Sequence, residues 1–384
     1  MINCKHFGRC GGCTYLDIPY SEELAKKEAT LRETLGPHGH LLEAMIPAPS
    51  PEGYRNKMEL AFGDEGKNGQ LAIGMRKRRS FYEVASLENC ILIPDDFKKI
   101  TALVQDYFRK TGEPFYHRKR HLGSLRHLVL RRGEFTREIL IILATTSQLE
   151  TDLPPLVAQL KELPLEGQIK GILHSVNDGV ADVVKHENTS ILWGQDYYHE
   201  HLCGLIFKVS AFSFFQTNSA GAEKLYGVIK DFAALGTTAP LAYDLYCGTG
   251  TIAQVLSPSF EKVIGIELNP DAIKAAKENA TLNNITNCDF HAGDVQEVLN
   301  TIETIPATTI VDPPRDGLHP KALAKLIAMA PPTLIYVACK PASLARDLVH
   351  LIEAGYQPIK VIGVDMFPRT PHVEAVALLQ RANI

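Results

Sequence analysis

The sequence predicts an α/β protein with a doubly wound, mostly parallel sheet in its C-terminal part and a β-rich N-terminal part. Toward the C-terminus, short apolar runs alternate with amphipathic stretches, as in "APLAYDLYCGTGTIAQVL" and "TLIYVACKPASLARDLVHLIEAG". Repeated strand-helix units of this length indicate parallel strands with helices on both faces. Between about Gly53 and Val209, short runs of strand-forming residues separated by Gly, Asp and Asn predict β-strands with one or two inserted helices.

The chain is long enough for two or three domains, because its 384 residues are 45% apolar. We place one boundary, so that residues 1–205 form a β-rich region and residues 206–384 form the doubly wound domain. Within the first region, "SEELAKKEATLRETL" predicts a helix. At the C-terminal end, "QPIKVIGVDMFPRTPHVEAVALLQR" predicts two strands around a proline-rich loop, so the sheet should end in an antiparallel hairpin.

Composition and charge limit the expected cellular location and the expected class of protein. The N-terminus lacks the apolar core of a secretory signal, and the apolar run Ile139–Ala144 is far shorter than the roughly 20 residues of a spanning helix. We therefore expect a soluble cytoplasmic protein and a monomer. Eight cysteines in a reducing cytosol should be thiols, ligands or catalysts. The net charge of −4 gives no global sign of nucleic acid, so local charge must provide it.

A glycine-rich turn marks a candidate cofactor pocket. In "YDLYCGTGTIA" a strand ends at Tyr246, and Gly248 and Gly250 allow a tight turn beneath a ligand before a helix begins. Glu267 closes the next strand about twenty residues later, the spacing of a carboxylate that binds a ribose. With Ala253, these glycines also satisfy the dinucleotide fingerprint, so NAD remains an alternative cofactor.

Two acidic residues at later strand ends favour S-adenosylmethionine over NAD. Asp294 in "HAGDV" ends a third strand, where a carboxylate can meet the adenine amino group. Asp312 begins the rigid turn "DPPR", which projects its side chain into the crevice at the carboxyl ends of the strands. A helix-start carboxylate is the alternative role for Asp312.

A cysteine at the end of the fifth parallel strand, Cys339 in "YVACKPASLARDL", predicts pyrimidine chemistry. Carbon 5 of a pyrimidine becomes nucleophilic only after a group adds to carbon 6, and a thiolate can add and leave again. Lys340 and the following helix should lower the pKa of Cys339. Glu374 is the candidate base for the carbon-5 proton, with His372 as its alternative. The alternative function is that of an amino-group methyltransferase of the same fold, which needs no cysteine. The alternative role for Cys339 taken alone is that of a packed core thiol.

Several stretches occur in an informative order: "FFQTN", "DLYCGTG", "DPPRDG", "YVACKP" with "LARDL", and "DMFPRTPHVEAV". This set resembles the motifs of the uridine carbon-5 RNA methyltransferases, which make 5-methyluridine in tRNA and 23S ribosomal RNA, and the resemblance spans almost the whole chain. It implies that Cys339 is the nucleophile, that Glu374 removes the proton, and that Gln216 and Asp312 line a site shared by uracil and cofactor. It also implies a set of residues that hold S-adenosylmethionine: Tyr246, Glu267 and Asp294.

The chain departs from that family at three points. Its nucleophile motif is Ala-Cys-Lys-Pro, where the family more often has Ser-Cys-Asn-Pro. Thr251 follows Gly250 where many members carry Asn, so it offers the cofactor only a hydroxyl. Many members begin with a small β-barrel RNA-binding domain, whereas this sequence starts directly at the cysteines. On that ground and by family analogy, we expect 23S ribosomal RNA rather than tRNA as the substrate.

Cysteines near the N-terminus form a candidate metal site. Cys4, Cys10 and Cys13 are spaced C-x(5)-C-x(2)-C among glycines, and Cys90 in "LENCILIP" is the best candidate for a fourth ligand. Four thiolates suit zinc, and the spacing is not a common iron-sulfur run, so the residues themselves leave both metals open. The resemblance implies a 4Fe-4S cluster, for which we expect a structural or RNA-positioning role. The remaining thiols have no assigned role: Cys203, Cys247 and Cys288.

Two basic stretches with interleaved aromatics predict RNA contact. "MRKRRSFYE" and "FYHRKRHLGSLRHLVLRRG" combine side chains that can track phosphates with aromatics that can stack on splayed bases. A solvated face of a strand or helix is the alternative for either stretch. Because carbon 6 is hidden in a stacked helix, the target base should be flipped into the crevice. The basic residues are Arg76, Lys77, Arg78, Arg79, Arg118, Lys119, Arg120, Arg126, Arg131 and Arg132.

Overall fold

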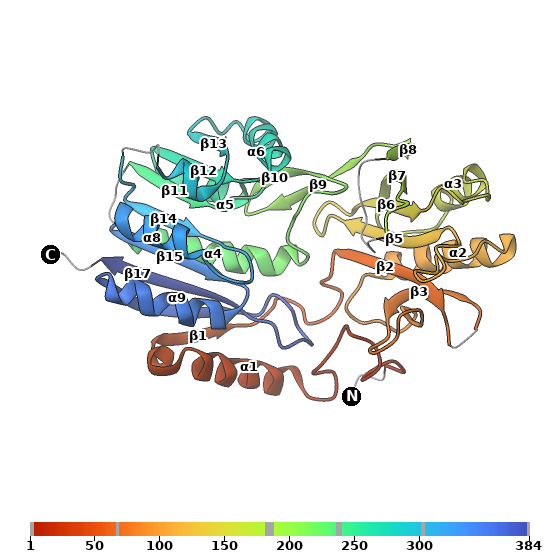
Figure 1. The fold of residues 1–384 in the computed structure, drawn as a ribbon, viewed down its shortest axis with the longest axis horizontal. Coiled ribbons are helices and arrows are strands. Elements are labelled where there is room, and N and C mark those ends of the chain that lie inside the picture. The colour runs from red at the N-terminus through yellow and green to blue at the C-terminus, as the bar shows by residue number, and fades with distance from the viewer. Residues whose placement is uncertain (1–3, 67–68, 181–187, 236–239, 301–303, 382–384) are drawn as a thin grey trace.

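A computed structural model describes residues 4–66, 69–180, 188–235, 240–300 and 304–381 of the chain. These residues form an eight-stranded sheet and a seven-stranded sheet that lie side by side, with a two-stranded hairpin between them (Figure 1). The predicted α/β C-terminal part and β-rich central part are both confirmed. Among the described residues, no helix combines the length and the apolar character that crossing a membrane requires.

The eight-stranded sheet has the order β1-β16-β17-β15-β14-β11-β12-β13. Strands β11 to β15 run parallel to one another, whereas β17 lies antiparallel between β15 and β16. The parallel sheet therefore ends in the antiparallel hairpin that the sequence predicts. The strands are β1 (Leu42–Ile46), β11 (Leu241–Leu245), β12 (Lys262–Glu267), β13 (Cys288–Ala292), β14 (Thr308–Val311), β15 (Thr333–Ala338), β16 (Tyr356–Val364) and β17 (Glu374–Arg381).

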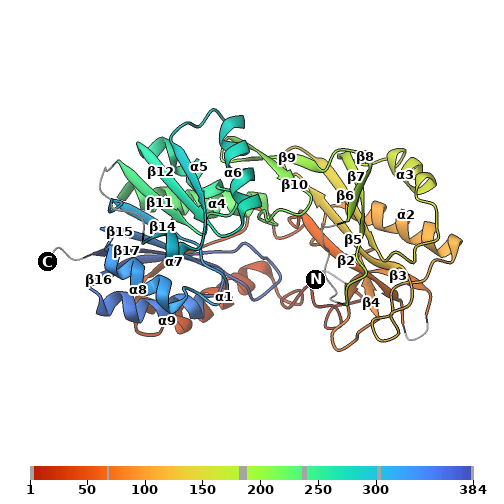
Figure 2. The same cartoon turned by 45° about the horizontal axis from the view of Figure 1, so that its top comes forward.

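Helices cover both faces of this sheet, and β15 shows why (Figure 2). Successive side chains of a strand point to opposite faces, so Ile335 and Val337 pack in the core with α4, α5 and α6. Leu334 and Tyr336 pack in a second core with α1, α7, α8 and α9. The helices are α1 (Tyr20–Thr34), α4 (Ser219–Leu235), α5 (Thr251–Leu256), α6 (Pro270–Leu282), α7 (Val295–Val298), α8 (Pro320–Met329) and α9 (Pro341–Glu353).

The N-terminal residues contribute to the C-terminal sheet, which the sequence does not predict. After α1 and the short 3-10 helix η1 (Gly36–Leu41), β1 pairs in parallel with β16, with Leu42 opposite Val361. The apolar side chains of α1 and β1 share one core with those of β16 and α9. A single boundary between residues 205 and 206 therefore does not describe the chain, because its first helix and strand pack on the C-terminal sheet.

The seven-stranded sheet has the order β4-β3-β2-β5-β6-β7-β8 and is antiparallel except for the β6–β7 pair, which α3 connects. Helix α2 buries Phe97, Ile100, Val104 and Phe108, spaced along one side of a helix. The elements are β2 (Lys57–Asp64), β3 (Leu71–Arg76), β4 (Val84–Ser86), α2 (Asp95–Thr111), β5 (Leu125–Arg132), β6 (Glu138–Thr145), α3 (Pro154–Lys161), β7 (Gln168–Val176) and β8 (Thr189–Gly194), followed by the hairpin β9 (Tyr197–Leu202) and β10 (Leu205–Ser210).

Candidate active site

A cavity of about 1320 Å³ lies at the carboxyl ends of the parallel strands. Its wall also includes residues of the N-terminal loop and of the central sheet, such as Gly12, Met75 and Ile191. Open α/β sheets bind their ligands at this edge. The cavity brings together residues that the sequence predicts to act in one site: Gln216, Tyr246, Thr251, Glu267, Asp312, Cys339 and Glu374.

The glycine turn after β11 forms the floor of one part of this cavity. Gly248 and Gly250 have φ angles of +54° and +72°, a left-handed conformation that favours glycine. A Cβ on Gly250 would lie 2.5 Å from the Phe290 ring, so no larger residue fits there. Glu267 holds the turn, because its Oε2 accepts a hydrogen bond from the Gly248 N–H at 3.2 Å. The turn and the carboxylate thus lie together, as a cofactor cradle requires.

Asp294 is the predicted cofactor residue that does not line the cavity. Its side chain accepts a hydrogen bond from the Gln296 N–H at 2.7 Å and caps helix α7. Burial raises the pKa of Tyr246 to about 12, and the charge of Asp294 raises it further, which is consistent with a position of Asp294 near Tyr246. Its contact with adenine stays a prediction.

Burial dominates the electrostatics of the reactive residues. It raises the pKa of Asp312 to about 7. It also raises the pKa of Glu374 to about 8, with a further contribution from Asp312 and an opposing one from Arg315. Carboxyl groups in such surroundings retain their protons near neutral pH until a positive charge or a polar ligand enters. The cavity therefore holds acids matched to proton transfer at physiological pH.

The predicted low pKa of Cys339 is wrong for the protein without ligands. Burial raises the pKa of Cys339 to about 11, and the charges of Glu374 and Asp312 raise it further, against the field of Arg315. Lys340 does not offset them, because its half-exposed side chain extends to Asp316, with 4.0 Å between Nζ and Oδ1. The sequence places a lysine next to Cys339, but it does not show that the charges of Glu374 and Asp312 also act on the thiol.

Two residues of the cavity wall were not predicted from the sequence. Arg315 lines the cavity, and its charge lowers the pKa of both Cys339 and Glu374. Its position directly after Asp-Pro-Pro was an available signal. Tyr226 is buried in α4 and lines the cavity together with Gln216. Tyr226 gives no such signal, because its spacing on the helix is that of an ordinary core residue.

The four N-terminal candidate ligands gather in one place. Burial raises the pKa of Cys13 to about 12, and the charges of Cys90, Cys10 and Cys4 raise it further. These four half-buried cysteines are ligands of the kind that bind metals through thiolates. Within the described ranges, however, no three or more His, Cys, Asp or Glu side chains are arranged as a metal site. The 4Fe-4S cluster, with zinc as its alternative, therefore stays a prediction.

Part of the predicted RNA surface is wrong. The side chains of Arg126, Arg131 and Arg132 are buried, so they cannot track phosphates. Arg131 instead holds the loop after β10: its guanidinium donates to the carbonyl oxygens of Ser210 (3.0 Å), Ala211 (2.9 Å) and Ser213 (2.7 Å). This loop leads directly to Gln216. The exposed members of the two stretches are Arg78, Arg79, Phe81, Lys119, Arg120, His121 and Leu122.

We expect Arg131→Met to raise the KM for RNA by about 10-fold, the effect of losing roughly 1.4 kcal/mol. Without its three hydrogen bonds, the loop before Gln216 no longer presents a fixed cavity wall. Binding of S-adenosylmethionine should change less, because the glycine turn lies on other strands. Arg126→Met is the matched control, since Arg126 is equally buried but donates to Asn177 and Gly179, which do not line the cavity. Equal effects of the two substitutions in steady-state assays would contradict this role.

Comparison with known proteins agrees with the fold and with the predicted class of enzyme. A family model described as tRNA (Uracil-5-)-methyltransferase matches residues 166–382. An uncharacterized RNA methyltransferase from Clostridium acetobutylicum is 47% identical over 99% of this chain and 84% of its own length. Another, from Clostridium tetani, is 44% identical over the same shares. The crystal structure of Pyrococcus abyssi tRNA (uracil-54, C5)-methyltransferase in complex with S-adenosyl-L-homocysteine has a TM-score of 0.79 and 28% identity, covering 96% of this chain and 86% of that one.

The doubly wound sheet, with a glycine turn, carboxylates and a cavity at its strand ends, has the fold of an α/β methyltransferase. The chain belongs to the tRNA (uracil-5-)-methyltransferase family. It is an S-adenosylmethionine-dependent RNA (uracil-5) methyltransferase, as the sequence predicts.

Proposed function

We propose that this enzyme methylates carbon 5 of a specific uridine through a covalent bond between Cys339 and carbon 6 of uracil. The observation that carries the proposal is that Cys339, Asp312 and Glu374 line one cavity with the glycine turn. The cavity thus holds a nucleophile and a base beside the expected methyl donor. An amino-group methyltransferase of the same fold needs neither the thiol nor the base.

The reaction follows from these two groups. The Cys339 thiolate forms a bond to carbon 6, and the electron pair of the ring double bond moves toward carbon 5 and its carbonyl. S-adenosylmethionine supplies the methyl group, which carbon 5 takes as the bond from methyl to sulfur breaks. Glu374 then removes the remaining proton from carbon 5, the double bond re-forms, and Cys339 leaves as a thiolate.

The remaining cavity residues have binding roles in this proposal. Gln216, which lines the cavity together with the buried Tyr226, and Asp312 hold the flipped uracil next to the cofactor. A second set holds S-adenosylmethionine, with Asp294 reaching adenine from the cap of α7: Tyr246, Thr251, Glu267 and Asp294. The exposed basic and aromatic residues of the central sheet hold the RNA strand.

Two RNAs are candidates for the substrate. The sequence favours 23S ribosomal RNA, while the archaeal relative of known structure is named for uracil 54 of tRNA. The test uses total RNA that lacks 5-methyluridine, incubated with the protein and isotope-labelled S-adenosylmethionine. We expect the label in 5-methyluridine, and fragment mapping then identifies the RNA. Label in an amino-methylated nucleoside would overturn the proposal.

We expect the rate of release of the methylated adduct to rise with pH and to level off above about pH 8, because Glu374 must be ionised to remove the carbon-5 proton. A glutamate with its ordinary pKa would place this rise near pH 4.5. The raised pKa of Cys339, about 11, acts on the earlier step, so the rate of adduct formation should keep rising above pH 8 as the thiolate fraction grows. Single-turnover rates measured across this pH range show the rise without interference from product release. A flat profile between about pH 6 and about pH 8 would contradict the assignment of Glu374.

We further propose that Cys4, Cys10, Cys13 and Cys90 hold a 4Fe-4S cluster, with zinc as the alternative. The protein purified without oxygen should contain iron and sulfide, and Cys13→Ser should lower both, because one of four ligands is lost. Cys203→Ser is the control, since Cys203 is exposed in the turn between β9 and β10. Zinc without sulfide would favour the alternative. Absence of any metal in the unchanged protein would contradict both.

A further inference from the structure

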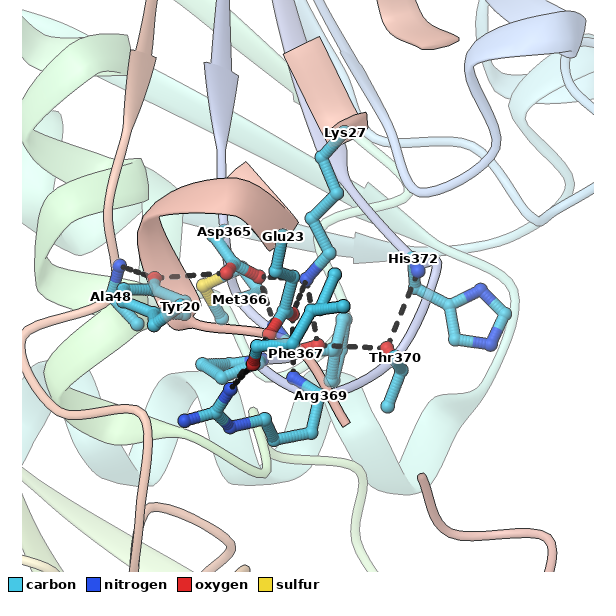
Figure 3. A network of polar contacts seen from close by, with 12 residues as sticks. Tyr20, Glu23, Lys27, Ala48, Asp365, Met366, Phe367, Arg369, Thr370 and His372 are labelled. Carbon is cyan, nitrogen blue, oxygen red and sulfur yellow. Dashed lines mark hydrogen bonds and ion pairs between the residues drawn. The ribbon is translucent and has the colours of Figure 1, made fainter. Parts of the chain in front are cut away.

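The loop between β16 and β17, residues 365–373, is fixed by four buried charged side chains (Figure 3). Glu23 and Lys27 come from α1, and Asp365 and Arg369 come from the loop itself. We call these residues the four-charge network. Its side chains are between 0% and 6% exposed, and the two acids balance the two bases.

Lys27 lies at the centre of the network. Its Nζ is 2.8 Å from Glu23 Oε1 and 2.8 Å from Asp365 Oδ1, and it donates to the Phe367 carbonyl oxygen at 3.1 Å. The Tyr20 hydroxyl donates to the other oxygen of Asp365 at 2.9 Å. Lys27 therefore joins the helix to both a side chain and a backbone group of the loop.

Arg369 forms the other side of the network and has an unusual backbone. Its φ angle is +68°, a conformation that costs energy for a residue other than glycine. The Arg369 N–H donates to Glu23 Oε1 at 2.6 Å, and its guanidinium donates to the Ile18 carbonyl oxygen at 3.2 Å. The Arg369 carbonyl oxygen accepts from the N–H groups of Thr14 (2.7 Å) and Tyr15 (3.2 Å). These contacts hold one strained turn in place.

The turn continues to the cavity. The Thr370 hydroxyl donates to the Phe367 carbonyl oxygen at 2.7 Å and accepts from the His372 N–H at 3.3 Å. Phe367, Thr370, Pro371 and His372 all line the cavity together with Glu374. The backbone of Glu374 is itself fixed by the strand pairing of β17. The network therefore determines the shape of the cavity wall around the Glu374 carboxyl group, whereas the strand pairing determines the position of the Glu374 Cα.

A gain in stability does not account for this arrangement. Burying charges costs several kcal/mol per ion, and apolar residues of similar volume often stabilise a protein as well. Buried ionic groups can instead select one geometry among several. Here the selected geometry is that of the cavity wall beside the proposed base.

We propose that Lys27 and Arg369 are positioning residues for proton removal by Glu374. In that step Glu374 takes the carbon-5 proton, the C–H electron pair re-forms the ring double bond, and the bond from Cys339 to carbon 6 breaks. Glu23 and Lys27 lie outside residues 166–382, so the N-terminal helix supports a step that the family-matched region performs. The inference rests on the proposed covalent mechanism.

The test compares Lys27→Met with Lys26→Met, a change at the neighbouring, half-exposed lysine that pairs with Glu22 on the same helix. Both variants are mixed with S-adenosylmethionine and RNA, and the rates of adduct formation and of turnover are measured on denaturing gels. Lys27→Met should form the methylated adduct at a near-normal rate but release it about 10-fold more slowly. Lys26→Met should behave like the unchanged enzyme.

Further variants distinguish a failure of this inference from a failure of the proposed function. Arg369→Lys keeps the charge and the backbone constraint but loses the guanidinium contact, and it should show the same delayed release even if Lys27→Met does not fold. Lys27→Arg should restore release in part. If Lys27→Met and Arg369→Lys slow adduct formation and adduct release equally, the inference is overturned and the proposed function is not. Absence of adduct in Glu374→Gln, with methylation persisting in Cys339→Ala, would instead overturn the proposed function.

Discussion

Cys339→Ala should abolish methyl transfer, with a loss of about 10⁴-fold or more in turnover, the scale seen when a covalent nucleophile is removed. Carbon 5 of uracil has no nucleophilic character until carbon 6 is attacked, and no other thiol in the described part of the cavity lies beside Asp312 and Glu374. Binding of S-adenosylmethionine should be retained, since the glycine turn is unchanged. Labelled methyl transfer and calorimetric titration measure the two effects separately.

Cys247→Ala is the matched control for this prediction. Cys247 lines the same cavity and is buried, whereas Cys339 is half-buried, but Cys247 lies in the glycine turn, and burial raises its pKa strongly. Its replacement should leave adduct formation intact. Methylation that persists in Cys339→Ala, with a labelled amino nitrogen as product, would contradict the covalent mechanism and favour the amino-group methyltransferase.

The site was largely predictable from the sequence because of the geometry of a parallel sheet. All carboxyl ends of such strands meet at one edge, so residues that follow separate strands converge without any local sequence link. Asp312 and Cys339 each come directly after a strand, and Glu374 begins the strand that returns beside β15. Three residues distant in sequence are therefore found in one cavity.

The features that the sequence did not reveal depend on contacts between distant segments. The pairing of Leu42 with Val361 has no local signal, and neither has the ion pair of Lys27 with Asp365. Arg131 and Arg132 were mistaken for surface residues because a run of basic residues is ordinarily solvated, yet every residue of β5 is buried. The same limit applies to Cys339, whose pKa depends on carboxylates from other strands.

Glu374→Gln should stop the reaction after methyl transfer, so that a methylated RNA-protein adduct accumulates while turnover falls by about 10³-fold or more. Glutamine has nearly the same shape as glutamate but cannot accept the carbon-5 proton. Loss of the buried acid should not destabilise the fold, because Glu374 already favours its neutral form, with a pKa of about 8. A denaturing gel with labelled S-adenosylmethionine shows the adduct, and nuclease mapping identifies the trapped uridine.

His372→Asn separates the two candidate bases, since His372 lines the same cavity two residues before Glu374. Burial lowers the pKa of His372, and the charges of Arg315, Lys27 and Arg55 lower it further, so its imidazole is neutral and could accept a proton. If His372→Asn rather than Glu374→Gln traps the adduct, the base is the histidine. If Glu374→Gln traps the adduct, the carboxylate removes the proton. If the double variant with Glu374→Gln and Cys339→Ala then forms no adduct, the RNA is bonded to the Cys339 thiol, because only such an adduct disappears with that thiol.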